Sequence, residues 1–564
     1  VKSVYFTNRW RLEPSDPEAY REGKTVEPKK PIVFYIDTLI PESIKPYVIA
    51  GVKEWNAAFE KIGFKNVMQA KDFPMDDPEF DPDNLKYSCI RYAPIDVANG
   101  MGPSWTDPRT GEIINASVYI YHDVIKLVND MRFVQTAQVN ERVRTKKLPQ
   151  DILDESLNYV IAHEVGHCLG LMHNMGASSS YPVDSLRSAS FTQKYGTTPS
   201  IMDYARNNYI AQPGDKGLRL TPPNIGVYDF YAIKIGYQPI PEAKTAEEEN
   251  AIVRGWIAEK AGDPMFRYGK QQLQAVYDPS ALMEDLGDDA VKAGEYGIKN
   301  LKYILEHVNE WMDKEDPNFD YRINIYGEIV NQCFGYLYNA LMNIGGFYLN
   351  EHEVNDPRPS FAVVPKEKQK QSLRFLIKNL QQLEWLDNPQ VTENLRVSSP
   401  RSERLVKNFA AALLVNTKKI SLGEYRDPNS YSSQEYLNDL HALVWEPTIK
   451  GKNLSAIDML LQKTILSSLL NSLLPVNWTV KRPPIAEKPM LRRTCSCGEH
   501  MASGFEFQYP VYNIAHDNTK YLYFSLLDRI EKTVKSKRAT GNFNTRAHHA
   551  YLLEMIEDFR NRKE

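Results

Sequence analysis

The sequence predicts an α+β region followed by a mostly α-helical one. Short apolar runs with strand-like alternation and one amphipathic helix lie before Tyr237, whereas long stretches of helical periodicity follow it. A chain of 564 residues is also too long for one compact core. We therefore expect an N-terminal arm at residues 1–30, an α+β domain at 31–237 and a helical region at 238–564.

The first half of the α+β region contains three expected strands and one helix. Residues 31–37 (PIVFYID) are short, β-branched and aromatic, which is typical of a buried strand. Residues 42–62 should form a helix, because apolar residues recur there at three- and four-residue spacing. Further strands are expected at 64–70 and 87–93, on either side of a loop rich in Asp and Pro.

A hairpin is predicted next, with strands at 101–106 and 112–121 joined by a turn at 107–111. Apolar residues alternate along the second strand, so one of its faces should be buried. Pro103 lies inside the first strand, and proline cannot donate to an inner ladder. The first strand of this hairpin is therefore expected at a sheet edge.

The helix expected at about 150–169 carries the residues that predict chemistry. His163 and His167 are four positions apart, so both imidazoles can reach one metal ion from the same helical face. Glu164 lies beside them, where its carboxylate can contact a metal-bound water instead of the metal. Gly170 should end the helix, because glycine tolerates the positive φ that a sharp turn requires.

After that turn, His173 can return to the same ion as a third ligand. Three neutral imidazoles leave the fourth tetrahedral position of zinc open, which is the arrangement of a catalytic site and not of a structural one. The spacing therefore predicts one zinc ion per chain, held by His163, His167 and His173, with Glu164 as the general base that activates the zinc-bound water.

The run from residue 163 to 173 (HEVGHCLGLMH) resembles the extended zinc motif of the metzincins, which is followed by a Met-turn. Residues 200–204 (SIMDY) look like the Met-turn of astacins and serralysins. The resemblance implies a metzincin-type catalytic domain with a twisted mixed sheet and an active-site helix. It also implies that Met202 lies beneath the zinc and that Tyr204 binds zinc or the transition state.

The resemblance narrows to large bacterial Met-zincin metallopeptidases with a helical C-terminal region. It implies a zinc-dependent peptidase, and an endopeptidase in particular, that acts on peptides or proteins. The substrate would lie extended along the edge strand formed by Gly100, Met101, Gly102 and Ser104. The matching stretches are residues 9–14, 27–37, 51–64, 107–116, 163–174 and 286–302.

Members of that group usually carry a secretion signal and an additional N-terminal region. The resemblance therefore implies a secreted, periplasmic or cell-surface protein, although this chain contains no targeting signal of its own. Hydrophobic content of 42%, charged content of 25% and a net charge of -4 are typical of a globular protein and give no electrostatic case for nucleic acid. No apolar run approaches the ~18 residues of a transmembrane helix. The oligomeric state stays open.

Beyond residue 238 the sequence predicts helices without recognisable chemistry. Asp285, Asp288 and Asp289 fit either a calcium site or a helix N-cap, and we favour the cap. The helices are expected at residues 289–312, 325–349, 366–386, 402–417, 432–472 and 545–563, with loops at 350–365 and 476–490.

Several other histidines and cysteines are interpreted as structural. Five cysteines are too few, and of the wrong parity, for a disulfide framework. The residues interpreted as structural are Cys495, Cys497 and His500 in a loop, Cys168 as a small buried hydrophobe, His122 at a strand end, and His548 and His549 on a solvated terminal helix.

Two alternatives to a peptidase remain. A metzincin scaffold without turnover could bind glycoproteins, but the presence of Glu164 argues against this interpretation. A zinc amidohydrolase that acts on a non-protein amide is the other, since the metal ligands alone do not distinguish the two hydrolases.

Overall fold

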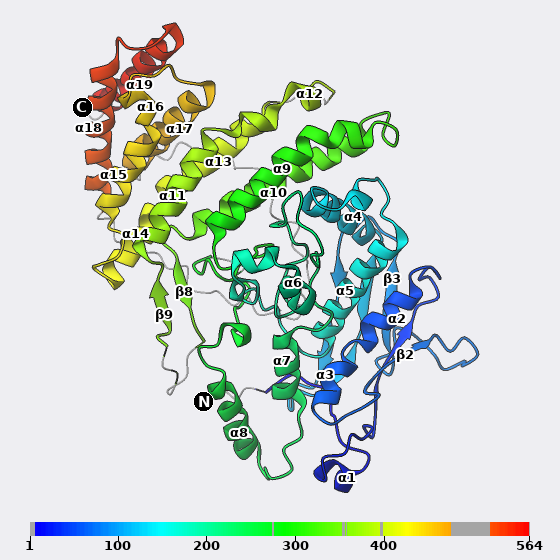
Figure 1. Ribbon diagram of the computed structural model, residues 1–564. Coiled ribbons are helices and arrows are strands. Elements are labelled where there is room, and N and C mark those ends of the chain that lie inside the picture. The colour runs from blue at the N-terminus through cyan, green and yellow to red at the C-terminus, as the bar shows by residue number, and fades with distance from the viewer. Residues whose placement is uncertain are drawn as a thin grey trace.

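The computed structural model describes residues 6–272, 276–351, 356, 358–394, 397, 399–474 and 519–562. Its first part is built on a sheet that helices cover, and its second part is a stack of helices that extends away from the sheet (Figure 1). The predicted combination of an α+β region and a helical C-terminal region is confirmed. Cys495, Cys497, His500 and the predicted loop at 476–490 lie outside the described residues.

The main sheet has five strands in the order β2-β1-β3-β7-β4. The first four strands are parallel, and β4 pairs antiparallel with β7 at the edge, through Gly100 opposite Ile120 and Met101 opposite Tyr119. The sheet is therefore mixed, as predicted. Its strands are β1 (Ile32–Ile36), β2 (Met68–Asp72), β3 (Ser88–Ala93), β4 (Gly100–Met101) and β7 (Val118–Tyr121).

The predicted hairpin forms, but each of its strands is divided. Strand β5 (Ser104–Thr106) pairs with β6 (Ile113–Ala116) in a separate two-stranded sheet, while β4 and β7 belong to the main sheet. The division falls at Pro103, which has no N–H to donate and accepts a hydrogen bond from Ser117 N at 3.0 Å. The edge strand that was expected because of Pro103 is β4, which lies at one end of the main sheet.

The single helix predicted at 42–62 is two helices, α2 (Lys45–Lys53) and α3 (Asn56–Lys61). They meet at Trp55, a fully buried side chain whose Nε1 donates to Ala162 O of α5 at 2.9 Å. Helix α5 (Gln150–Cys168) has the predicted bounds within one residue. A Cβ at Gly51 would lie 2.8 Å from Ile161 Cβ, so glycine allows α2 to pack closely against α5.

Helix α4 (Val124–Thr136) was not predicted. Its buried face includes Asn129, Asp130 and Arg132 beside apolar residues. Buried polar side chains remove the apolar stripe by which a sequence pattern reveals a helix. The other helices of four or more residues before residue 238 are α1 (Pro17–Arg21), α6 (Ala189–Tyr195) and α7 (Val227–Tyr237), with 3-10 turns at Glu141–Val143, Ser178–Ser180 and Val183–Arg187. Helix α8 (Ala246–Glu259) and a 3-10 turn at Pro264–Phe266 follow.

In the helical region, α10 packs against α9 and α11 and also contacts α4 of the first part. The helix predicted at 432–472 is divided into α15, α16 and α17, and the predicted loop at 350–365 contains β9, which pairs with β8. The elements are α9 (Ala290–Met312), α10 (Asp320–Met342), β8 (Phe347–Leu349), β9 (Phe361–Val363), α11 (Lys366–Leu380), a 3-10 turn (Leu383–Asp387), α12 (Pro389–Thr392), α13 (Arg401–Val415), α14 (Thr417–Arg426), α15 (Ser433–Val444), α16 (Glu446–Ile449), α17 (Ala456–Leu473), α18 (Lys520–Lys537) and α19 (Phe543–Asn561).

The prediction that His548 and His549 are solvated is wrong. Helix α19 packs on α17 and α18, so both imidazoles are buried. His548 Nε2 lies 3.3 Å from Gln462 Oε1, and His549 Nε2 lies 3.4 Å from the Thr448 hydroxyl. The charged residues near them in sequence face the other side of the helix. They suggested a solvated helix, although the two histidines make polar contacts inside the core.

Three other structural interpretations agree with the coordinates. Asp289 caps α9, since its carboxylate accepts from the N–H groups of Val291 and Lys292. Cys168 is buried in the core with a free thiol. At the end of β7, Nδ1 of His122 lies 2.5 Å from the hydroxyl of Tyr92. Within the described residues, no helix combines the length and apolar character needed to cross a membrane.

Candidate metal centre

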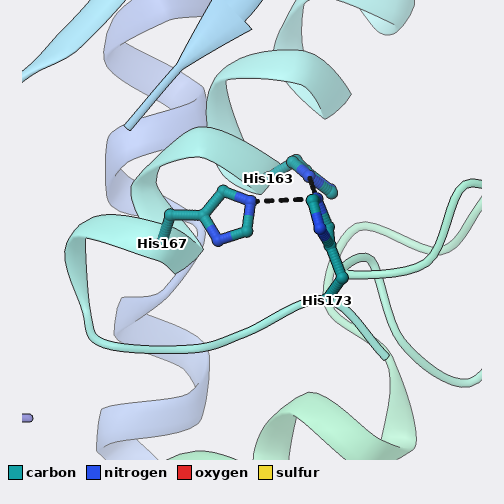
Figure 2. Close-up of side chains that lie close together, drawn as sticks. All are labelled: His163, His167 and His173. Carbon is teal, nitrogen blue, oxygen red and sulfur yellow. Dashed lines mark hydrogen bonds between the residues drawn. The ribbon is translucent and has the colours of Figure 1, made fainter. Parts of the chain in front are cut away.

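The two histidines of helix α5 and the turn after it bring three imidazoles together. Gly170 has φ +86°, and a Cβ at this position would lie 2.1 Å from Asn8 O. A side chain would therefore clash at the turn that redirects the chain, which is the role predicted for this glycine. His173 returns beside His163 and His167, and all three side chains are buried (Figure 2).

The three Nε2 atoms point at one another. His173 Nε2 lies 3.2 Å from His163 Nε2 and 3.1 Å from His167 Nε2. Ligand nitrogens around a tetrahedral zinc ion lie about 3.3–3.4 Å apart, as follows from Zn–N distances of about 2.0–2.1 Å. Among the described residues, His163, His167 and His173 are the one cluster of at least three possible ligands whose ligand atoms lie close enough together to hold a metal ion.

The other ring nitrogens establish which tautomer fits. Nδ1 of His163 lies 2.6 Å from Ile201 O, Nδ1 of His167 lies 2.8 Å from Leu171 O, and Nδ1 of His173 lies 2.9 Å from Gln271 Oε1. Each of these partners is an acceptor, so each Nδ1 carries the proton and each Nε2 presents a lone pair to the centre. Three converging lone pairs repel one another without a cation, so the donor set fits zinc.

Burial keeps these imidazoles in the neutral form that binds metal. It lowers the pKa of His167 to about 4 and that of His163 and His173 well below the usual value, and the neighbouring histidines lower the latter two further. Neutral ligands need not release a proton before a cation enters at neutral pH.

Glu164 lies against the sheet edge with one carboxylate oxygen available for an incoming group. A Cβ at Gly100 would be 3.1 Å from Glu164 Oε1, whereas Oε2 is buried and has no hydrogen-bond partner among the described residues. Burial raises the pKa of Glu164 to about 8, and the positive charge of Arg206 opposes that rise. A bound dication would also favour the carboxylate form.

The turn that contains Met202 lies directly beneath α5. Met202 is buried, and a Cβ at Gly166 would be 2.3 Å from its Sδ, so glycine is needed where the helix passes over the methionine. Asp229 of α7 fastens this turn, because its carboxylate accepts from the Ser200 hydroxyl at 2.7 Å and from Ile201 N at 2.9 Å. The carbonyl of Met202 accepts from Asn174 N, next to the third histidine.

Tyr204 stands beside the triad from this turn. Its ring centroid lies 5.4 Å from that of His163 and 4.8 Å from that of His173. The guanidinium carbon of Arg206 lies 4.5 Å from the centre of the Tyr204 ring. The Tyr204 ring thus lies beside two of the three histidines and against a cation.

A comparison with protein families agrees with this geometry. Residues 145–452, more than half of the chain, match a family model described as Met-zincin. The chain belongs to the Met-zincin family. No curated protein and no solved structure matches it. Family membership and the histidine triad together support a zinc metallopeptidase in general terms.

The edge strand of the Met-zincin lies next to these groups. Gly100 and Met101 form β4, and Ser104 begins β5 just beyond it. A Cβ at Gly102 would lie 2.2 Å from Glu164 O, so this glycine allows the strand to approach α5. The close neighbour of Gly102 is therefore the helix that carries His163 and His167.

Part of the site comes from segments in which the sequence indicated no function. A cavity of about 340 Å³ adjoins His163, Glu164 and Tyr204 and continues between α4, α10 and residues 281–284. Gln271, the partner of His173, comes from the segment just before residues 281–284. No local pattern reveals Gln271, because it lies 98 positions from the histidine that it contacts.

The segment with Gln271 is fixed to the loop of the third histidine. Asn174 donates to Arg267 O at 2.9 Å and accepts from Gly269 N at 2.7 Å. A Cβ at Gly176 would lie 2.8 Å from Gly269 Cα, so the two backbones pass each other closely. Arg267 also pairs with the buried Asp278 at 2.7 Å. These contacts make the region beyond residue 237 part of the metal centre.

Proposed function

We propose that this Met-zincin is a zinc-dependent endopeptidase in which Glu164 is the general base. The observation that carries the proposal is the buried Oε2 of Glu164, which has no partner among the described residues and belongs to the residue adjacent to a zinc ligand. A carboxylate that is fixed beside a metal-binding triad, but does not belong to it, suits proton transfer. His163, His167 and His173 would hold the zinc ion.

The chain's own residues would move the proton and stabilise the developing charge. Bound zinc polarises the substrate carbonyl and makes an attacking water more acidic. Glu164 takes a proton from that water and then passes it to the nitrogen of the leaving amine, so no net proton is consumed in breaking the amide bond. Tyr204 donates a hydrogen bond to the carbonyl oxygen as negative charge forms on it.

The substrate backbone would lie along the sheet edge. Strand β4 has a paired neighbour, β7, on one side and ends the sheet on the other. An extended peptide can add to such an edge through main-chain hydrogen bonds. Gly100 and Met101 would provide these bonds next to Glu164, and Ser104 would extend the contact toward β5. The secreted, periplasmic or cell-surface location implied by the resemblance remains a prediction.

The test is cleavage of casein or gelatin by the purified chain, with the metal content measured in parallel. We expect cleavage within the substrate chains, loss of activity with a chelator, and recovery when about one zinc per molecule is restored. Products that result only from removal of terminal residues would contradict the endopeptidase assignment. A zinc-loaded protein that binds proteins without cleaving them would favour the binding alternative. Hydrolysis restricted to small non-protein amides would favour the amidohydrolase.

A further inference from the structure

The cavity beside the metal centre has walls from both parts of the chain. Helix α5 and the Met202 turn contribute His163, Glu164 and Tyr204, while α10 contributes Gly335 and Tyr336 from the helical region. A volume of about 340 Å³ falls in the range of pockets that hold small ligands, roughly 300–1,000 Å³. It can therefore receive a large side chain of a substrate bound at the metal.

Two arginines of the cavity wall are paired with carboxylates, whereas Glu164 keeps one buried oxygen without a partner among the described residues. Arg206 Nε lies 3.3 Å from a carboxylate oxygen of Glu284, and Arg132 lies 2.5 Å from Glu155. Aliphatic and aromatic side chains of α4, α5 and residues 281–283 form much of the remaining wall. This combination of paired charges and apolar walls suits an apolar substrate side chain.

Gly335 occupies a position in α10 where a side chain would enter this space. It lines the cavity, and a Cβ built on it would meet no heavy atom within 4 Å, apart from neighbouring residues of its own helix. Glycine in the middle of a helix is disfavoured relative to alanine, so neither packing nor helix formation accounts for it. Gly294 and Gly297 of α9 differ, because a Cβ there would lie 2.8 Å from Phe375 and 2.5 Å from Tyr336.

Tyr336, which follows Gly335 in the cavity wall, is packed on two sides. The ring of Tyr336 packs onto Gly297 and lies 4.4 Å from the ring of Tyr209. Tyr336 is buried, so we do not expect its ring to move into the space at Gly335. The depth of the cavity at this point depends on the missing side chain.

We propose that Gly335 sets the depth of the pocket that receives the substrate side chain next to the scissile bond. The helical region then selects large apolar side chains for a reaction carried out by the first part of the chain. This inference rests on the proposed peptidase function, because it assigns the cavity to that function's substrate.

The decisive comparison is between two substitutions in the same helix. Gly335→Leu should fill the cavity, whereas Gly327→Leu is the matched control, since Gly327 is also in α10, also has open space at its Cβ position, and does not line the cavity. Both variants are tested as full-length, zinc-loaded protein. The probes are peptide hydroxamates with an alanine, leucine or phenylalanine side chain beside the zinc-binding group, and binding is measured by calorimetry.

We expect the unaltered protein to bind the phenylalanine and leucine probes more tightly than the alanine probe. Gly335→Leu should weaken the phenylalanine probe by about 10-fold or more, because a filled pocket excludes a large group. Its affinity for the alanine probe should hardly change, and Gly327→Leu should keep the original order. If Gly335→Leu does not fold, Gly335→Ala should show the same trend by a smaller factor.

The pocket assignment is overturned if Gly335→Leu keeps the original order of affinities, or if Gly327→Leu changes it equally. Hydroxamate binding needs zinc but no turnover, so the two proposals can fail separately. A protein that ranks the probes as expected but cleaves no protein keeps the pocket and loses the peptidase function. One that cleaves casein but binds all three probes equally keeps the peptidase function and loses the pocket.

Discussion

The two parts of the chain contribute differently to one site. The three candidate zinc ligands come from an eleven-residue stretch of the first part, His163 to His173. The wall formed by α10 and the hydrogen-bond acceptor for His173 come from beyond residue 237. The first part thus holds the candidate ligands, and the second part contacts one of them and lines the space beside them. The boundary at 237/238 marks a change of secondary structure, and the site spans it.

The largest effect should come from removing a zinc ligand. His173→Ala should lower zinc affinity by more than the roughly 10- to 100-fold that loss of an outer partner costs, and activity should fall to background. Metal content after dialysis and zinc titration measure this. Retention of stoichiometric zinc in the variant would show that His173 is not a ligand. The comparison between the two parts of the chain would then lose its basis.

The next largest effect should come from Glu164→Gln, which keeps the shape of the side chain but cannot accept a proton. We expect kcat to fall roughly 10²- to 10⁴-fold, the usual contribution of a positioned general base. Bound zinc should stay near one per molecule, since the carboxylate is not among the ligands. Loss of zinc together with activity would mean that Glu164 acts as a ligand.

Tyr204→Phe should have a smaller effect, confined to turnover. Loss of one donor to a developing oxyanion costs roughly 10²- to 10³-fold where the donor is fully used, so a fall in kcat of about 10-fold or more is expected. The ring that packs beside His163 and His173 is retained, so zinc content should not change. Turnover equal to that of the unaltered protein would reduce Tyr204 to a packing role.

Gln271→Leu tests the contribution of the second part to the metal. Removal of the acceptor for Nδ1 of His173 should weaken zinc binding roughly 10- to 100-fold. Gln271→Glu is the matched control, because a carboxylate oxygen still accepts that hydrogen bond. Zinc affinities, measured by competition with a chromophoric chelator, should separate the two variants. Equal affinities in both would show that the region beyond residue 237 does not orient the ligand.

Local sequence patterns predicted part of the metal centre, but they did not reveal Gln271. The triad and Glu164 could be identified because their spacing is local, and a helix followed by a tight turn converts local spacing into geometry. The Met202 turn was identified by the resemblance of residues 200–204 to the Met-turn of the metzincins. The sheet was predictable from alternation, although Pro103 divided its hairpin.

The remaining features depended on contacts that leave no periodic trace in the sequence. Helix α4 was missed because Asp130 and Arg132 are buried in it. The cavity wall at Gly335 and the buried His548–His549 pair arise from packing between segments far apart in the chain. Such contacts become visible only in the folded structure.

The smallest expected effect is a pH dependence of stability that arises in the helical region. In the helical region His441 is buried and stacks on Trp445, with ring centroids 5.4 Å apart. Burial, and then the charge of Arg529, lowers the pKa of His441 to about 4. The unfolded chain takes up a proton near pH 6.5, so His441 stabilises the fold fully above that pH and loses this contribution as pH falls toward 4. At pH 5 the loss is at most about 2 kcal/mol.

His441→Phe should remove this pH dependence, because phenylalanine can still stack but does not titrate. Urea unfolding at pH 7 and pH 5 should show a decline in stability that is about 1–2 kcal/mol smaller in the variant. The zinc-binding histidines are the same in both proteins, so their contribution cancels in the difference. Thr533→Val is the control, since it removes the 3.2 Å contact to His441 Nε2 but leaves the imidazole, and it should decline as the unaltered protein does. An equal decline in His441→Phe would show that the acid sensitivity does not come from His441.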